Sequence, residues 1–331
     1  MKKFLFLFLV VFALNGCNDG DLEVESFDFS TVNTQKCNLG STDPTQFYLF
    51  KVNGKEALII QIPEADFPNI VTPEGAPRSY DIAGSIKVIY RLYDADINTE
   101  TICSAIPSST PNVVSEWNAI GGTIEVTTSA VNPINETTGA TVITKYSHTI
   151  TFKNIVFDRG NGTEQNNDSI TFGTYETPAL QPVAFDNIDI NDCASNNLLF
   201  KYSGLQALTL NLDAATYADL FANEVTTTDA PRTALISATN KLNYRVFETG
   251  LTLDYFCATT TPTTPVLKEI WEGETGVDGV SGIIEVETTT NGPNFVHTIR
   301  FKNVTYKNNA TTPLEFSLGT NYLFGEFVTP G

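Results

Sequence analysis

The chain has 331 residues, of which 41% are hydrophobic, so it is long enough to bury more than one domain core. Its 38 acidic and 19 basic residues give a formal net charge of −19, and so acidic a surface repels the phosphates of nucleic acids and anionic lipid headgroups. The charge therefore argues against nucleic acid as a partner and suits a neutral ligand, a basic protein surface or a divalent cation.

The N-terminus has the pattern of a secretory signal peptide. Two lysines precede an uncharged apolar run from Phe4 to Leu14, which is shorter than the roughly 18 residues needed to span a bilayer. Residues 1–16 are therefore predicted to be removed. Residues 14–17, with the sequence LNGC, resemble the lipobox of bacterial lipoproteins, in which the cysteine is acylated and becomes the new N-terminus. The resemblance implies a lipid anchor on Cys17, with an ordinary secreted protein as the alternative.

Acidic residues dominate the following segment, residues 17–26. Asp19, Asp21, Glu23 and Glu25 resemble the export signal that directs some lipoproteins of Bacteroidota to the outer face of the cell. The resemblance implies an outer-membrane protein that contacts the membrane through its lipid, with the cell surface favoured over the periplasmic face. A solvated tether is the alternative, because runs of charge are commonly flexible chain.

Four cysteines remain once Cys17 is assigned to the lipid, two in each half of the chain. Cys37 and Cys103 are 66 residues apart, and Cys193 and Cys257 are 64 apart. These similar separations predict the disulfides Cys37–Cys103 and Cys193–Cys257, formed in an oxidising compartment. A zinc site is the rival interpretation, but the chain has no CxxC spacing and only two histidines.

The two halves of the chain repeat one another along most of their length. Matched segments include Phe27-Asp28 with Phe185-Asp186, Leu49-Phe50-Lys51 with Leu199-Phe200-Lys201, Ala76-Pro77-Arg78 with Ala230-Pro231-Arg232, and His148-Thr149-Ile150 with His297-Thr298-Ile299. The repetition predicts two homologous domains, residues 27–178 and 185–331, joined by a short linker at 179–184.

Hydrophobic residues within each half alternate with polar ones, which is the pattern of half-buried β-strands. Residues 85–93 and 296–306 are clear examples, and abundant Thr, Val, Ile and aromatic residues agree with strand propensity. Only residues 214–224 are predicted as a short helix, capped by Asp213. We therefore predict an all-β fold made of two tandem antiparallel β-sandwich domains, Ig-like or jelly-roll-like.

Tryptophan and histidine occur twice each, at matching positions of the repeat. An exposed indole stacks well on a sugar face, so Trp117 and Trp271 are candidate ligand-stacking residues. Packing at one end of the core is the favoured alternative, because Trp combines a large apolar area with one polar atom. His148 and His297 have apolar neighbours two positions away, so we interpret them as packed strand residues rather than ligands or catalytic bases.

Acidic side chains provide weaker candidates. Glu125 and Glu285 match across the repeat and lie between apolar residues, so they are predicted to point outward from strands rather than to form a hydrolase pair. Residues 158–162 and 186–192 are rich in oxygen ligands for calcium, yet neither has the spacing of an EF-hand loop. No metal, cofactor or catalytic residue is assigned.

The predicted layout, a lipid anchor followed by tandem sandwiches, looks like that of accessory glycan-binding lipoproteins of Bacteroidota polysaccharide uptake systems. The similarity implies a non-enzymatic cell-envelope lipoprotein that acts as a binding module, with a glycan as one candidate ligand. Two alternatives stay open: a structural or adhesion lipoprotein that contacts other proteins, and a hydrolase that acts on polysaccharide. Exposed tryptophans favour a glycan, buried ones favour a structural or adhesion role, and two carboxyl groups about 5 to 10 Å apart in a cleft favour a hydrolase.

Overall fold

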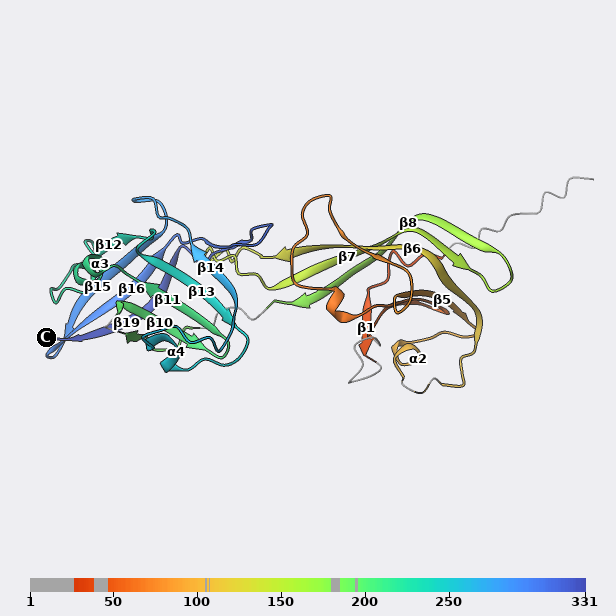
Figure 1. Ribbon diagram of the computed structural model, residues 1–331, viewed down its shortest axis with the longest axis horizontal. Coiled ribbons are helices and arrows are strands. Elements are labelled where there is room, and N and C mark those ends of the chain that lie inside the picture. Colours follow the sequence, from red (N-terminus) through yellow and green to blue (C-terminus); the bar gives the residue numbers. More distant parts are fainter. Residues whose placement is uncertain (1–26, 39–46, 105, 107, 180–184, 194–195) are drawn as a thin grey trace, which may run out of the picture.

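The computed structural model describes residues 27–38, 47–104, 106, 108–179, 185–193 and 196–331 of the chain (Figure 1). β-Strands dominate these residues and the helices are short, so the predicted all-β fold is confirmed. The predicted signal peptide, the lipid site at Cys17 and the acidic tether lie outside the described residues, as do positions 180–184 of the predicted linker. Within the described part of the chain, no helix is long and apolar enough to cross a membrane.

The first half of the chain, residues 27–178, forms an antiparallel sheet of eight strands. The strands are β1 (Gln35–Asn38), β2 (Phe47–Asn53), β3 (Glu56–Gln61), β4 (Arg78–Asp81), β5 (Lys87–Tyr93), β6 (Val113–Val131), β7 (Lys145–Asp158) and β8 (Glu164–Pro178). Their order is β1-β2-β3-β5-β6-β7-β8. β5 pairs with the first part of β6 and β4 with a later part. The long strands therefore belong to both layers of a curled sheet (Figure 1).

A change in the pleat of β7 marks the point where these strands bend. Buried side chains fall on even-numbered positions in 146–152 and on odd-numbered positions in 155–157. Asn154 lies between them with φ 49°, a left-handed conformation that Asn tolerates better than most residues. In the neighbouring strand Gly122 has φ 105°, and a Cβ there would lie 2.7 Å from the Cα of Ile155. The bend therefore requires glycine at position 122.

The second half, residues 185–331, breaks the equivalent long strands into pieces and forms two sheets. A seven-stranded sheet has the order β18-β17-β14-β13-β11-β10-β9, and a four-stranded sheet has the order β12-β15-β16-β19. The strands are β9 (Asn191–Cys193), β10 (Leu198–Ser203), β11 (Gln206–Asn211), β12 (Arg232–Leu235), β13 (Lys241–Phe247), β14 (Leu267–Gly273), β15 (Ile283–Asn291), β16 (Asn294–Lys302), β17 (Tyr306–Asn308), β18 (Glu315–Phe316) and β19 (Asn321–Pro330). Asn303, between β16 and β17, has φ 48° and matches Asn154.

Helices are short and lie outside the sheets. They are α2 (Thr99–Cys103), α3 (Ala214–Leu220), α4 (Leu253–Cys257) and the 3-10 helix η2 (Glu64–Asp66). The predicted cap of α3 is confirmed, because the Asp213 side chain accepts from the Thr216 backbone N–H at 2.8 Å. The helix ends four residues before the predicted position 224, since Asn223 and Glu224 accept hydrogen bonds from Thr329 and from Arg232. These tertiary contacts compete with a further helical turn.

The two halves contact each other through apolar packing and backbone hydrogen bonds. Ile143 lies just before β7 and Tyr146 lies in it, and both side chains are buried in the cluster that forms the core of the second half. The Thr141 N–H donates to the Ser317 carbonyl at 2.9 Å, and nearby the Thr320 N–H donates to a carbonyl of the β6–β7 loop at 2.8 Å. The second core therefore depends on side chains supplied by the first half.

Candidate functional site

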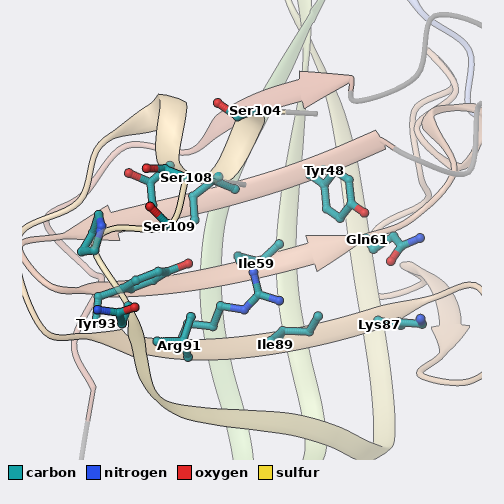
Figure 2. Close-up of a pocket in the computed structure, with 15 residues that line it drawn as sticks. Tyr48, Ile59, Gln61, Lys87, Ile89, Arg91, Tyr93, Ser104, Ser108 and Ser109 are labelled. Atoms are coloured by element: carbon teal, nitrogen blue, oxygen red, sulfur yellow. The ribbon is translucent and has the colours of Figure 1, made fainter. Parts of the chain in front are cut away.

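A hollow of about 500 Å³ lies on the face of β2, β3 and β5 that is turned away from the large core of the first half (Figure 2). Side chains of these strands form its floor, and Ser104, Ser108, Ser109 and Pro111, which follow α2 in the sequence, line its other side. The volume falls within the roughly 300–1,000 Å³ typical of ligand pockets. The residues of this hollow, here named the first-half pocket, are Tyr48, Ile59, Gln61, Lys87, Ile89, Arg91, Tyr93, Thr101, Ile102, Ser104, Ser108, Ser109, Pro111, Asn112 and Val113.

Strand register arranges the floor of the first-half pocket in rows. Tyr48 pairs with Gln61 and Gln61 pairs with Lys87, so these three side chains cross the sheet in one row. Ile59 and Ile89 form the next row on the same face. A polar and aromatic row therefore borders an apolar one. Ligand sites use this combination, because polar groups orient a ligand while apolar groups supply contact area.

Arg91 is the charged group at the centre of the floor. Its guanidinium extends across the floor toward Ile59 (Figure 2), and its Nε donates to Glu116 Oε2 at 2.7 Å. Burial lowers the pKa of Arg91, but the hydrogen bond and ion pair with Glu116 outweigh it and raise the pKa overall. Burial likewise raises the pKa of Glu116, and hydrogen bonds from Arg91 and Asn118 bring it below its ordinary value. The pair is therefore ionised, with a third of the Arg91 side chain exposed.

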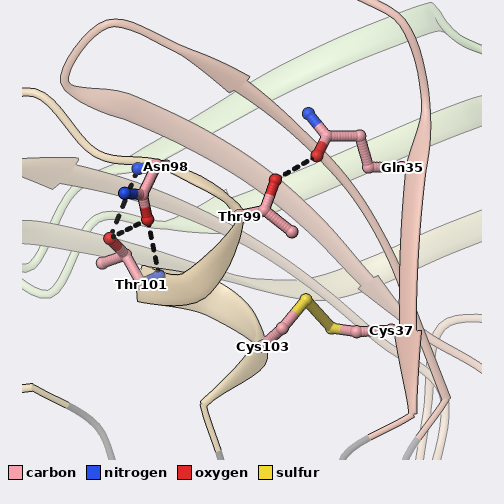
Figure 3. The surroundings of a disulfide bond; sticks show 6 residues. All are labelled: Gln35, Cys37, Asn98, Thr99, Thr101 and Cys103. Carbon is pink, nitrogen blue, oxygen red and sulfur yellow. Dashed lines mark hydrogen bonds between the residues drawn. A yellow bond between two sulfur atoms is a disulfide. The ribbon is translucent and has the colours of Figure 1, made fainter.

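A disulfide and a hydrogen bond attach α2, one wall of the pocket, to β1 (Figure 3). Cys37 in β1 is bonded to Cys103 at the end of α2, and the two Cα atoms are 5.7 Å apart. Thr99 Oγ1 at the start of α2 donates to Gln35 Oε1 in β1. Both ends of the helix are therefore held against the same strand.

A capping box stabilises the first turn of α2. The Asn98 side chain accepts from the Thr101 backbone N–H, and the Asn98 backbone N–H donates to the Thr101 hydroxyl (Figure 3). Thr101 and Ile102 in turn line the first-half pocket. The local sequence thus determines how this wall is placed over the sheet.

The equivalent face of the second half is filled by aromatic rings. Phe256 in α4 stacks on Phe200 in β10 with ring centroids 4.3 Å apart. Each of these helices ends in the cysteine of its disulfide, so Thr101 and Ile102 of α2 occupy the positions of Tyr255 and Phe256 of α4. The smaller pair leaves space over the first-half sheet. The first-half pocket thus coincides with the smaller side chains of α2.

Both predicted disulfides are confirmed. The second joins Cys193 in β9 to Cys257 in α4, with Cα atoms 5.5 Å apart. It occupies the same place in the second half as Cys37–Cys103 does in the first. Each bond therefore fastens a short helix to the first strand of its half.

Both tryptophans are buried, with 2% and 3% of their area exposed. The Arg159 guanidinium lies 4.7 Å over the Trp117 ring, and the Tyr90 ring is 4.6 Å away. Trp271 borders a second hollow, of about 600 Å³, where the two halves meet, but Phe316 packs against its ring at 5.2 Å. Burial of both indole rings in the core therefore argues against the candidate ligand-stacking role of Trp117 and Trp271.

The two histidines take part in matching chains of buried hydrogen bonds. Thr128 Oγ1 lies 2.8 Å from His148 Nδ1, and Thr177 Oγ1 lies 2.9 Å from His148 Nε2. The second half repeats these contacts with Thr288, His297 and Thr329. Burial, together with a nearby arginine, lowers the pKa of each histidine to about 4. Both ring nitrogens of each histidine are hydrogen-bonded to threonine hydroxyl groups, which agrees with the interpretation of the histidines as packed strand residues.

The acidic candidates do not gather into a site. Glu285 forms an ion pair with Lys302 at 3.4 Å across β15 and β16, and Glu125 lies opposite Thr151 in β7. Among the described residues, which include 158–162 and 186–192, no group of three or more His, Cys, Asp or Glu side chains is placed to hold a metal ion.

The residues of the first-half pocket were not singled out from the sequence. The alternation of side chains in residues 85–93 identifies one clearly buried face of the strand. It does not show that a helix covers the opposite face. The available signal was a difference between the halves. Thr101 and Ile102 stand where the second half has Tyr255 and Phe256, and loss of two rings beside a sheet indicates a hollow.

Comparisons of the chain with protein-family models, with curated proteins and with solved structures found no match. The function is therefore inferred from the chemistry of the pocket.

Proposed function

We propose that the protein is a non-enzymatic lipoprotein of the cell envelope that binds a carbohydrate in the first-half pocket. The observation that carries this proposal is the lining of the pocket. Half-buried Tyr48 and Ile89 supply its aromatic and apolar surface, Tyr93 and Ile59 are almost fully buried, and hydroxyl, amide and guanidinium groups lie around them (Figure 2). A sugar presents an apolar ring face, which packs on aromatic and aliphatic side chains, and hydroxyl groups, which bond to polar side chains.

The contrast between the halves supports a ligand in this space. An unfilled hollow costs stability, because the atoms that line it lose packing contacts. The second half shows that the fold accommodates aromatic side chains here, since Phe256 stacks on Phe200. A hollow kept open in one copy and filled in the other is expected where a ligand occupies the space.

The lining supports binding over hydrolysis. The described residues of the first-half pocket include no carboxylate, and glycoside hydrolysis usually needs two. Glu116, beside the pocket, is held in an ion pair with Arg91. The groups that face the pocket are those that orient a polar ligand.

The lipid anchor belongs to the same proposal. Acylation of Cys17 attaches the protein to the outer membrane, and residues 18–26 act as a tether that lets the pocket face outward. Replacing Cys17 with Ser is expected to move the protein from the membrane fraction to the soluble fraction of a Bacteroidota host. A Cys17→Ser protein that still sediments with membranes would contradict the anchor.

A glycan array with the chain from residue 18 onward tests the binding function. We expect specific binding that is lost when α2 receives the aromatic pair of α4, in a Thr101→Tyr, Ile102→Phe variant, because these rings fill the pocket. Leu198→Ala, at the second-half position that matches Tyr48, is the control and is expected to bind normally. Equal binding by the filled variant and the parent would refute the pocket as the site.

Buried tryptophans and a long sheet edge favour a second candidate, a structural or adhesion lipoprotein. β8 ends the eight-stranded sheet and offers 15 residues of edge to another strand. Absence of array binding by a folded, disulfide-intact sample would transfer the assignment to this candidate.

A further inference from the structure

Positive charge is concentrated at the first-half pocket, although the chain is strongly acidic. The chain has 38 acidic and 19 basic residues, yet the described lining residues include Lys87, Arg91 and no carboxylate. Glu116 neutralises Arg91 in part, through the bond to its Nε. Lys87 is exposed and has no ion-pair partner in the part of the chain that the structure describes. The lining residues themselves therefore carry two positive charges and no negative one, while the carboxylates of Glu116 and Asp94 lie behind Arg91 and Asn112.

The two cations lie on one face of β5 with an apolar residue between them. Lys87, Ile89 and Arg91 are alternate residues of the strand, and all three line the pocket. Four residues of extended strand separate the Cα atoms of the two cations by about 13 Å. This length exceeds one sugar ring, so a ring over Ile89 has a cation within reach on either side.

We infer that the ligand of the first-half pocket is an acidic sugar, whose anionic substituent is held by Lys87 and Arg91 while its ring packs over Ile89. The inference rests on the proposed carbohydrate function and adds the charge of the ligand to it. Hydrogen bonds between a cationic donor and an anionic oxygen are about twice as strong as neutral ones. A carboxylate, as in a uronic acid, also matches the planar fork of the Arg91 guanidinium.

The second half contains a matched control for Lys87. Lys241 pairs with Asn211 in β11, as Lys87 pairs with Gln61 in β3. In that row Leu198 replaces the tyrosine of the first half. Lys241→Gln therefore removes one exposed charge from the equivalent strand position without touching the first-half pocket.

Calorimetric titration of the chain from residue 18 onward tests the inference with three probes of equal length. These are an oligogalacturonate, its fully methyl-esterified form, and a sulfated neutral oligosaccharide. We expect the oligogalacturonate to bind at least tenfold more tightly than its ester, and more weakly as salt is raised. Lys87→Gln is expected to weaken oligogalacturonate binding about tenfold and to leave ester binding unchanged, whereas Lys241→Gln changes neither.

The outcomes separate the inference from the function on which it rests. Equal affinity for the acid and its ester overturns the acidic sugar but leaves a carbohydrate pocket. No binding of any probe, from a folded sample that also fails on the glycan array, overturns both. Binding of the sulfated probe alone, lost in Lys87→Gln, supports the anionic sugar and identifies a sulfate ester rather than a carboxylate as its charged group.

Discussion

Each buried histidine is part of a chain of hydrogen bonds in which every group donates to the next. Arginine has donors only, so Thr128 Oγ1 accepts from Arg78 and gives its own hydrogen to His148 Nδ1. The ring proton is then on Nε2, which donates to Thr177 Oγ1. A second ring proton would oppose the hydroxyl hydrogen of Thr128. This network, in addition to burial, favours neutral histidine in both halves.

Acid is therefore expected to destabilise the protein through these histidines. Their pKa is about 4 in the folded chain and about 6.5 in an unfolded one, so only the unfolded chain takes up protons between these values. From pH 7 to 4.5 each histidine should lower the free energy of unfolding by about 2 kcal/mol. Urea denaturation of a His148→Gln, His297→Gln variant should show a shallower fall with acid than the parent. An unchanged fall would contradict this account.

Lysine is buried at matching positions in the two halves. Lys51 and Lys201 are each 3% exposed, and burial lowers the pKa of both. Lys51 Nζ donates to the carbonyl of Phe29 at 2.9 Å, and Lys201 Nζ donates to that of Phe185 at 3.2 Å. These bonds fix the chain that enters each half against its second strand. The sequence repeat contains both lysines together with Asp28 and Asp186, whose charges partly oppose the effect of burial on the lysine pKa values, but the repeat does not show that the lysines are buried.

Glycine beside the buried lysine is expected to be irreplaceable. Gly173 has φ 133°, and a Cβ there would lie 2.9 Å from Lys51 Nζ. Gly173→Ala should therefore lower the free energy of unfolding by roughly 2 kcal/mol more than Gly84→Ala, because φ 133° is less accessible to L residues than the φ of 61° at Gly84 and because Gly84 has open space around it. Equal losses in chemical denaturation would contradict both the backbone strain and the crowding at Gly173.

At the scale of elements, the alternation of apolar and polar residues predicted where strands occur, but it predicted the ends of the strands less accurately. The strand predicted at 85–93 is β5, residues 87–93, but the one predicted at 296–306 covers β16 and runs past its end into β17. The pleat changes phase at Asn303, and buried Val304 and Tyr306 continue an apolar pattern beyond the break. A backbone conformation at one residue ends the strand, and composition does not reveal it.

The two disulfides should differ in function and resemble each other in stability. Each closes a loop of about 65 residues, which by the chain-entropy model stabilises the fold by about 4 kcal/mol. Replacing Cys37 and Cys103 with Ser should also weaken ligand binding, because that bond holds α2 over the pocket. Replacing Cys193 and Cys257 should cost similar stability and leave affinity unchanged. Equal loss of affinity in both variants, measured under conditions where both are folded, would contradict the role of α2.

At the scale of the molecule, the internal repeat was visible in the sequence, whereas the contact between the halves was not. The predicted division at residues 179–184 stays a prediction. Tyr146 lies in a strand of the first half, and its alternation with His148 and Ile150 indicates burial without indicating where. The Tyr146 ring packs in the core of the second half. Burial there, together with the nearby Glu269 carboxylate, raises the pKa of Tyr146 to about 12.

Truncation of the Tyr146 side chain should therefore destabilise the second half, although Tyr146 is in a strand of the first half. Tyr146→Ala removes a nearly buried ring and is expected to cost about 3 kcal/mol. Hydrogen–deuterium exchange should quicken at amides of β13 and β14. Tyr175→Ala, which opens the first core instead, is the control and should quicken exchange in β7 and β8. Faster exchange confined to the first half in both variants would refute the shared core.

The position of Tyr146 also makes the two halves depend on each other. Here the first copy alone would present Ile143 and Tyr146 to solvent, and the second copy alone would lack them in its interior. Deletion of either half is therefore expected to leave the other with exposed apolar side chains or with an incompletely packed core.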